Sequence, residues 1–237
     1  MSTPANPDGV GLIIALPAEA HSIGVRGLGI GECTRWRDGW VAVSGMGPHN
    51  AMRAAERLLA CGVARLANWG VAGALASDLV SGDVLIPDRV CYMRDDPGFA
   101  TDAGLAEQLT ERLSASLRVR RGTLWSTPQP VATMADKQAL ATRSHALAVD
   151  MEAAPIAAVA ARAKLPFVAM KAICDPLDRE LPAGMAGALE GADRGWSLRM
   201  VSAIALGGPT TWRAARALSR DFRRARRSLA TAAALAA

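Results

Sequence analysis

The chain has 237 residues, of which 51% are hydrophobic and only 4% aromatic, and its formal net charge is +5. This length suits one α/β domain with a single core rather than two independent cores. Residues 1–9 lack the features of a secretory signal, and no run of eighteen apolar residues predicts a membrane span. Four cysteines without CxxC spacing argue against a disulfide framework or a zinc site. We therefore expect a cytoplasmic protein that uses no metal or cofactor.

The positive charge is concentrated near the C-terminus. Residues 212–229 contain seven Arg and one Asp, so the rest of the chain holds 20 basic and 21 acidic residues (27 − 7 and 22 − 1). The body is close to neutral, which argues against a nucleic-acid-binding body and makes the tail a separate question.

Short apolar segments alternate with helical patterns along the chain. The predicted strands are 10–16, 40–45, 64–73, 82–93, 120–126, 146–151 and 166–174. The spacing of apolar residues predicts helices over 50–61, 105–117 and 153–163, a loop or lid over 176–195, and a basic amphipathic helix at about 211–230. This alternation predicts an α/β fold with a largely parallel sheet, in one domain that spans residues 1–237.

Acidic residues and Gly-rich turns follow several of these strands. Glu19 comes after the first strand, Asp150 and Glu152 end the sixth, and Asp175 follows the seventh. The Gly-rich segments 44–50 and 69–73 lie at the ends of the second and third strands. In open α/β sheets, ligands bind beyond the carboxyl ends of the strands. One acid in such a place is usually a turn or helix cap, but acids at three strand ends beside two Gly-rich turns indicate a site.

Five segments resemble the purine nucleoside phosphorylase and nucleosidase superfamily in order and spacing, and most closely its methylthioadenosine/S-adenosylhomocysteine nucleosidases. They are VGLIIALPAEA, VAVSGMGPHNA, ANWGVAGALASDLVSGDVLIPD, AVDMEAAPIAAVA and FVAMKAICDPLD, within approximately residues 10–178. The most specific parts, VDMEA and ICDPLD, correspond to the family's V-E-M-E-A and I-S-D-x-x-D. The resemblance implies a three-layer fold with a mixed, largely parallel twisted sheet flanked by helices, and a homo-oligomer, commonly a dimer.

The resemblance also implies cleavage of the N-glycosidic bond of a purine nucleoside. Glu152 would accept hydrogen bonds from the ribose hydroxyls, and Met151 would lie against the sugar. Asp175 would supply a proton to N7 of an adenine, and Glu19 would activate the attacking water. Asp150, which replaces a Glu of the family motif, either supports the site or is a charge at a helix N-terminus. Further substrate contacts are implied at Gly45, Gly47, Val71, Ala72, Gly73, Pro130 and Val131.

The superfamily contains both hydrolases and phosphorylases. Asn68 and Val71 stand where phosphorylases carry Arg and Ser, and nucleosidases also carry Ser at the second position. Both departures remove phosphate ligands, so the sequence favours hydrolysis. Arg53 and His49, near the second turn, could still serve an anion, which leaves phosphorolysis open.

The tail combines an apolar stripe, formed by Leu218, Phe222, Ala225 and Leu229, with surrounding arginines. One hypothesis is contact with the anionic inner face of the cytoplasmic membrane. The alternatives are a helix packed on the body with a solvated basic face, or contact with an acidic or nucleic-acid partner. The predicted membrane-contact residues are Trp212, Leu218, Phe222, Arg223, Arg224 and Arg227.

The apolar Pro17 and Ala18 before Glu19, together with this tail, resemble the bacterial hopanoid-associated phosphorylases. That branch implies release of adenine from adenosylhopane, a lipid nucleoside of hopanoid biosynthesis. The alternatives are a soluble methylthioadenosine, adenosylhomocysteine or futalosine nucleosidase, a phosphate-dependent phosphorylase, and a nucleoside-binding protein with a docking tail.

Overall fold

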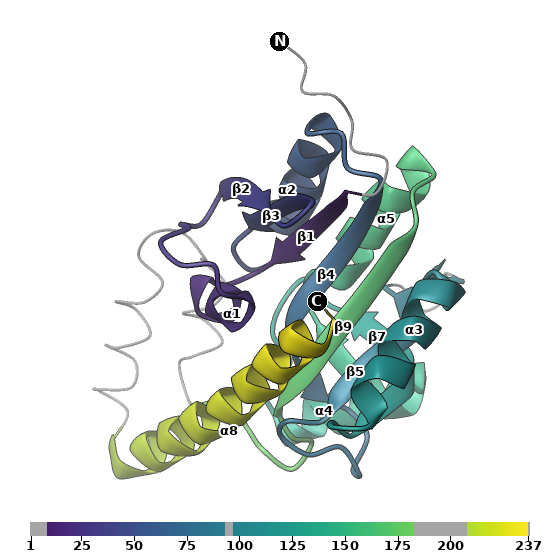
Figure 1. Cartoon of the computed structure of the whole chain (residues 1–237). Helices are drawn as coiled ribbons and strands as arrows, with labels where there is room; N and C mark the ends of the chain where they lie inside the picture. Colours follow the sequence, from purple (N-terminus) through teal and green to yellow (C-terminus); the bar gives the residue numbers. More distant parts are fainter. Residues whose placement is uncertain (1–8, 93–96, 183–207, 237) are drawn as a thin grey trace.

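A mixed β-sheet forms the centre of the part of the chain that the computed structural model describes, residues 9–92, 97–182 and 208–236 (Figure 1). Its strands are β1 (Val10–Ile14), β2 (Glu32–Trp36), β3 (Gly39–Val43), β4 (Arg65–Ala74), β5 (Val84–Cys91), β6 (Phe99–Ala100), β7 (Val119–Ser126), β8 (Ala148–Asp150) and β9 (Phe167–Asp175). Parallel pairs join β1 to β3 and β4, β4 to β9, and β7 to β5 and β8. Antiparallel pairs join β2 to β3, β4 to β8, and β5 to β6 and β9.

The long strand β4 makes the sheet curl back on itself. Its residues from Leu66 to Gly73 pair with β9 in parallel, and Gly73 and Ala74 pair on the other side with β8 in the opposite direction. Because β9 also pairs with β5, and β5 with β7, the pairing closes through β8 back to β4. The carboxyl ends of β8 and β9 therefore approach the same stretch of β4 from opposite directions. The sheet is therefore not the open sheet assumed when a site was predicted beyond the carboxyl ends of the strands. The ends of β8 and β9, which carry Asp150 and Asp175, nevertheless lie beside the same strand.

Helices cover both faces of the sheet. They are α1 (Pro17–Ala20), the 3-10 turn η1 (His21–Ile23), α2 (Pro48–Ala60), α3 (Ala103–Ser114), α4 (Met134–Ser144), α5 (Ala153–Ala163) and α8 (Gly208–Leu235). The buried faces of α2 and α5 share one core cluster with Ile13 and Leu66 of the sheet. On the other face, α3 and α8 pack against a second cluster that contains Leu12 and Met170. Figure 1 shows α8 crossing β9 on the side opposite α2 and α5. The predicted three-layer fold with a mixed sheet is confirmed.

Several elements were absent from the sequence prediction for physical reasons. The edge strand β2 is mostly exposed and polar, and β6 has only two residues. The helix α4 buries only Lys137 and Leu140. Because one of these two buried residues is charged, the helix has no periodic pattern of apolar residues that would predict it. The predicted loop over 176–195 is confirmed as non-helical at residues 176–182, and its remainder lies outside the described residues.

The apolar stripe of α8 packs on the protein. Ala225 and Leu229 are fully buried in the core cluster beneath the helix, and none of the described helices is long and apolar enough to cross a membrane. The burial of Ala225 and Leu229 agrees with the alternative in which the helix packs on the body and keeps a solvated basic face. The basic face, including Arg223 and Arg227, stays exposed.

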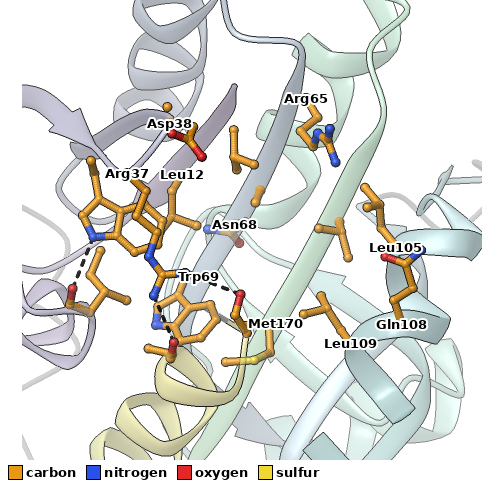
Figure 2. A pocket seen from close by; sticks show the side chains of 18 of the residues that line it. Leu12, Arg37, Asp38, Arg65, Asn68, Trp69, Leu105, Gln108, Leu109 and Met170 are labelled. Carbon is orange, nitrogen blue, oxygen red and sulfur yellow. Dashed lines mark hydrogen bonds between the residues drawn. The ribbon is translucent and has the colours of Figure 1, made fainter. Parts of the chain in front are cut away.

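Arg37, in the turn between β2 and β3, binds the C-terminal end of α8. The guanidinium of Arg37 donates hydrogen bonds to the carbonyls of Ala233 (3.2 Å) and Ala236 (3.4 Å), beside a cavity of about 310 Å³ (Figure 2). A cation is favourable there because the last carbonyls of a helix carry partial negative charge. This cavity contains none of the predicted catalytic residues.

Docking of α8 predicts a stability difference between two leucines of the same helix. Leu229→Ala should lower the free energy of unfolding by about 2–5 kcal/mol, because it leaves a cavity in a packed interface. Leu235→Ala, at a residue with 38% exposure, should change it by about 0.5 kcal/mol or less. Urea denaturation measures both. Equal, small effects would mean that α8 is not docked.

Candidate active site

A cavity of about 390 Å³ opens where β1, β4, β8 and β9 end. Three of the predicted acids line it together, Glu19, Glu152 and Asp175, and all three side chains are buried. The predicted contacts Met151, Val71, Ala72, Gly73, Pro130 and Val131 also line it. The remaining lining residues are Ala15, Leu16, Met46, Thr127, Val149, Asp150, Cys174, Leu181, Ala215, Leu218, Ser219 and Phe222.

Glu19 is held by backbone on both carboxyl oxygens. The short helix α1 begins at Pro17, directly after β1, and brings Glu19 back over the strand end. The N–H of Leu16 donates to Oε2 and the N–H of Val71 to Oε1, both at 2.9 Å. Burial raises the pKa of Glu19, whereas Lys171 and these N–H groups lower it. The carboxyl is thus fixed in orientation and more basic than an exposed one.

Glu152 is fixed at one oxygen by the turn after β3. The N–H of Gly47 donates to Oε1 at 2.8 Å. Burial raises the pKa of Glu152 to about 7; the charge of Lys171 opposes this rise and that of Asp150 adds to it. A carboxyl that ionises near neutral pH can accept hydrogen bonds from hydroxyl groups once it has lost its proton.

The two glycines predicted as substrate contacts form the turn beside Glu152. Gly47 offers its N–H to Glu152 rather than to the cavity, and neither Gly45 nor Gly47 is a lining residue. Both have positive φ angles, +82° and +92°, which a side chain would strain. Their role is the tight turn, and Met46 between them faces the cavity.

Asp150 has a structural role at the base of the cavity. Its Oδ1 accepts from the hydroxyl of Ser126 (2.6 Å), and its Oδ2 accepts from the N–H of Ala153 (2.9 Å) at the start of α5. The same Oδ2 pairs with the ammonium of Lys171 at 2.8 Å. These contacts occupy both oxygens, so Asp150 caps a helix and neutralises a buried cation, while Glu152, two residues later, faces the cavity.

Lys171 is the charge that the sequence prediction missed. It lies in the middle of β9, and its side chain is 2% exposed. Burial alone would lower the pKa of Lys171, but Asp150, Glu152 and Glu19 raise it, so the side chain stays charged. A single lysine inside the apolar strand FVAMKAIC was the available signal, since a buried lysine requires anionic partners.

Asp175 ends β9 opposite Gly73 of β4. Its Oδ2 lies 2.6 Å from the ammonium of Lys137 in α4, and its buried Oδ1 has no hydrogen-bond partner among the described residues. Burial raises the pKa of Asp175, and Lys137 opposes the rise. The unpartnered oxygen is therefore available to a bound molecule.

The two candidate anion ligands do not reach this cavity. His49 and Arg53 are exposed on α2, and neither lines it. Within the described part of the chain, the lining residues include no Lys, Arg or His. The same described residues contain no cluster of His, Cys, Asp and Glu that could hold a metal ion.

Helix α8 forms part of the cavity wall. Leu218 and Phe222, predicted as membrane contacts, line the cavity beside Ala215 and Ser219. These two side chains contribute an apolar wall to the cavity. Trp212, at 50% exposure, and the exposed Arg223, Arg224 and Arg227 lie elsewhere on the helix surface.

Residues 35–194 match the family described as the Phosphorylase superfamily. The chain belongs to this superfamily. It is 28% identical over 157 residues to the aminodeoxyfutalosine nucleosidase of Helicobacter pylori, which covers 59% of this chain and 68% of the relative.

Solved structures share the fold. A Helicobacter pylori nucleosidase mutant with 5′-methylthioadenosine in its active site is 22% identical, with a TM-score of 0.65, over 84% of this chain and 98% of that one. The Neisseria meningitidis 5′-methylthioadenosine/S-adenosylhomocysteine nucleosidase with methylthio-immucillin-A has the same identity and TM-score, over 92% and 99%. The futalosine hydrolase of Helicobacter pylori is 20% identical, with a TM-score of 0.63, over 91% and 98%.

The position of Glu19 depends on a glycine in β4. A Cβ added to Gly70 would lie 2.8 Å from Oε1 of Glu19, so Gly70→Ala should displace the carboxylate and lower kcat about 10²-fold. Gly104→Ala, on the exposed start of α3, is the matched control and should retain the wild-type rate. Steady-state kinetics and thermal melting measure both variants. A folded Gly70→Ala protein with an unchanged kcat would show that Glu19 has no part in turnover.

Proposed function

We propose that this chain is an N-glycosidase that hydrolyses the bond between adenine and ribose in an adenine nucleoside. The observation that carries the proposal is the convergence of Glu19, Glu152 and Asp175 on one cavity, where burial raises the pKa of each carboxyl. Carboxyls with raised pKa values in one cleft are typical of acid–base catalysis. Membership of the Phosphorylase superfamily supports the same reaction class.

Each acid would have a distinct part in bond cleavage. As the bond breaks, positive charge develops on the sugar, and the ionised Glu152 would stabilise it while accepting hydrogen bonds from the ribose hydroxyls. Asp175 would give its proton to N7, so that the base leaves neutral. Glu19 would take a proton from the water that attacks C1′. Met151 would pack against the sugar.

Hydrolysis suits this cavity better than phosphorolysis. Its described lining contains the carboxyls of Glu19, Asp150, Glu152 and Asp175 and no cationic side chain. A phosphate anion at a few ångströms from Glu19 would be repelled by about 1–4 kcal/mol in a partly wet site, whereas a water molecule needs that carboxylate as a base.

The walls of the cavity favour an apolar 5′ substituent. Leu16, Met46, Leu181, Leu218 and Phe222 line it together. We assign this wall to the 5′ end of the nucleoside, because the acids occupy the sugar and base side. The apolar wall and the exposed basic face of α8 support adenosylhopane, a membrane lipid, as the substrate.

A second candidate is a water-soluble adenine nucleoside. The relatives named above as methylthioadenosine/S-adenosylhomocysteine nucleosidase and aminodeoxyfutalosine nucleosidase favour it. An alkylthio group would also fill an apolar wall. The nature of the 5′ group therefore separates two candidates that share one reaction.

Adenine release from a panel of nucleosides tests the proposal. The panel contains methylthioadenosine, adenosylhomocysteine, aminodeoxyfutalosine and adenosylhopane, each assayed with and without phosphate. We expect adenine release that does not depend on phosphate, and a loss of about 10²-fold or more in Asp175→Asn. Strict dependence on phosphate would contradict hydrolysis, and full turnover by Asp175→Asn would contradict the role of the acid.

The lipid arm of the same panel tests the membrane hypothesis. With adenosylhopane in anionic vesicles, the double change Arg223→Gln and Arg227→Gln should lower activity roughly tenfold or more, since each surface arginine contributes about 1 kcal/mol to binding. The control, Arg53→Gln with Arg112→Gln, removes two exposed charges from α2 and α3. Equal losses in both proteins, or a loss on soluble substrates as well, would remove the membrane role.

A further inference from the structure

Lys137 is a lysine with no exposed side-chain surface, in a helix that contributes no predicted site residue. Its ammonium lies 2.6 Å from Oδ2 of Asp175 and donates to the carbonyls of Pro176 (3.0 Å) and Arg179 (2.7 Å). An ammonium has three N–H donors, and here three acceptors surround it. The three contacts are satisfied together only by the charged form, so Lys137 is a fixed cation behind the site.

This cation distinguishes the two oxygens of Asp175. Oδ2 is occupied by Lys137, and Oδ1 is buried without a partner among the described residues. Asp175 lines the cavity, whereas Lys137 does not. The ion pair therefore leaves one defined oxygen of the carboxyl for a group in the cavity, instead of two interchangeable ones.

The hydrogen bonds of Lys137 also hold the backbone on either side of the cavity. The chain enters α4 directly after Pro130 and Val131, which line the cavity, and the hydroxyl of Thr133 caps the helix by accepting the N–H of Asp136. The segment after Asp175 is held by the two carbonyl contacts of Lys137. One side chain thus joins the cavity wall before α4 to the strand end that carries the acid.

We infer that Lys137 is a positioning residue that orients Asp175 so that Oδ1 delivers the proton to the departing base. This inference rests on the proposed function. The Oδ1 proton moves to N7 as the C1′–N9 bond breaks, and the electron pair of that bond stays with the purine. Water then bonds to C1′ and loses its proton to Glu19, which balances the reaction as a hydrolysis.

The charges that face Asp175 set the sign of the expected effect. They are Lys137 from α4, Arg179 from the segment after β9 and Asp221 from α8. The neighbouring thiol of Cys174 is neutral, because burial and Asp175 raise its pKa. Burial raises the pKa of Asp175, Lys137 and Arg179 lower it, and Asp221 raises it. Without the Lys137 charge, the carboxyl holds its proton to higher pH.

The pH profile of kcat/KM in Lys137→Met tests the inference. The substrate is whichever panel nucleoside the wild type cleaves fastest. We expect kcat to fall about 10²-fold and the alkaline limb, where the acid loses its proton, to move to higher pH. Lys137→Arg keeps the charge and should keep the limb near its wild-type position. Lys164→Met, at an exposed lysine, is the control and should match the wild type in both.

Failure of the inference is distinct from failure of the proposed function. No adenine release by the wild type, or full turnover by Asp175→Asn, would overturn the function. If Asp175→Asn is inactive while Lys137→Met keeps the wild-type limb, with or without a loss of rate, Lys137 is only structural. Should the Met variant not fold, Lys137→Gln gives the same test. Loss of folding in both neutral variants would likewise assign Lys137 a structural role and overturn the inference.

Discussion

The site depends on four buried carboxyls that share two buried ammonium groups. Lys171 compensates Asp150 directly and lowers the pKa values of Glu19 and Glu152, while Lys137 pairs with Asp175. Buried charges persist only when they are paired and hydrogen-bonded. Burial raises the pKa values of Glu19, Glu152 and Asp175. Two cations for four acids also leave a deficit of positive charge. A sugar that becomes cationic during bond cleavage would compensate it.

The closed path of strand pairing brings these charges together. Lys171 points from the middle of β9 to Asp150 at the end of β8, although β8 and β9 run in opposite directions beside β4. The backbone N–H groups of Val71 and Gly47 orient the two glutamates. Rigid strand and turn backbone, rather than flexible side chains, therefore sets the geometry on which catalysis would depend.

Helix α8 serves the fold and the cavity at once. Its fully buried residues Ala225 and Leu229 stabilise one face of the sheet, and Leu218 and Phe222, further toward its N-terminus, line the cavity. All arginines of the helix except Arg226 are on its exposed surface. A basic sequence that looked like a separate tail is thus continuous with the wall of the cavity. On the proposed function, a change in its apolar residues would affect stability and substrate choice together.

The sequence allowed the layers, most strands and the acids Glu19, Glu152 and Asp175 to be predicted, because apolar periodicity and motif spacing are local signals. Lys137 and Lys171 could not be assigned in the same way, since the partners of a buried lysine come from strands and helices far apart in the chain. The hydrogen bond from the N–H of Gly47 to Glu152 could not be predicted either. Whether a backbone N–H faces a ligand or a neighbouring carboxylate depends on tertiary packing that residue identity does not encode.

A crystal structure with a non-hydrolysable adenine nucleoside analogue, carrying a cationic ring in place of ribose, tests the central claim most directly. We expect the ring hydroxyls within hydrogen-bonding distance of Glu152, about 2.6–3.2 Å, and N7 at the same distance from Oδ1 of Asp175. We also expect a water between Glu19 and the carbon equivalent to C1′. An analogue bound in a different cavity, or with these three carboxyls turned away from it, would contradict the proposed roles of the three acids.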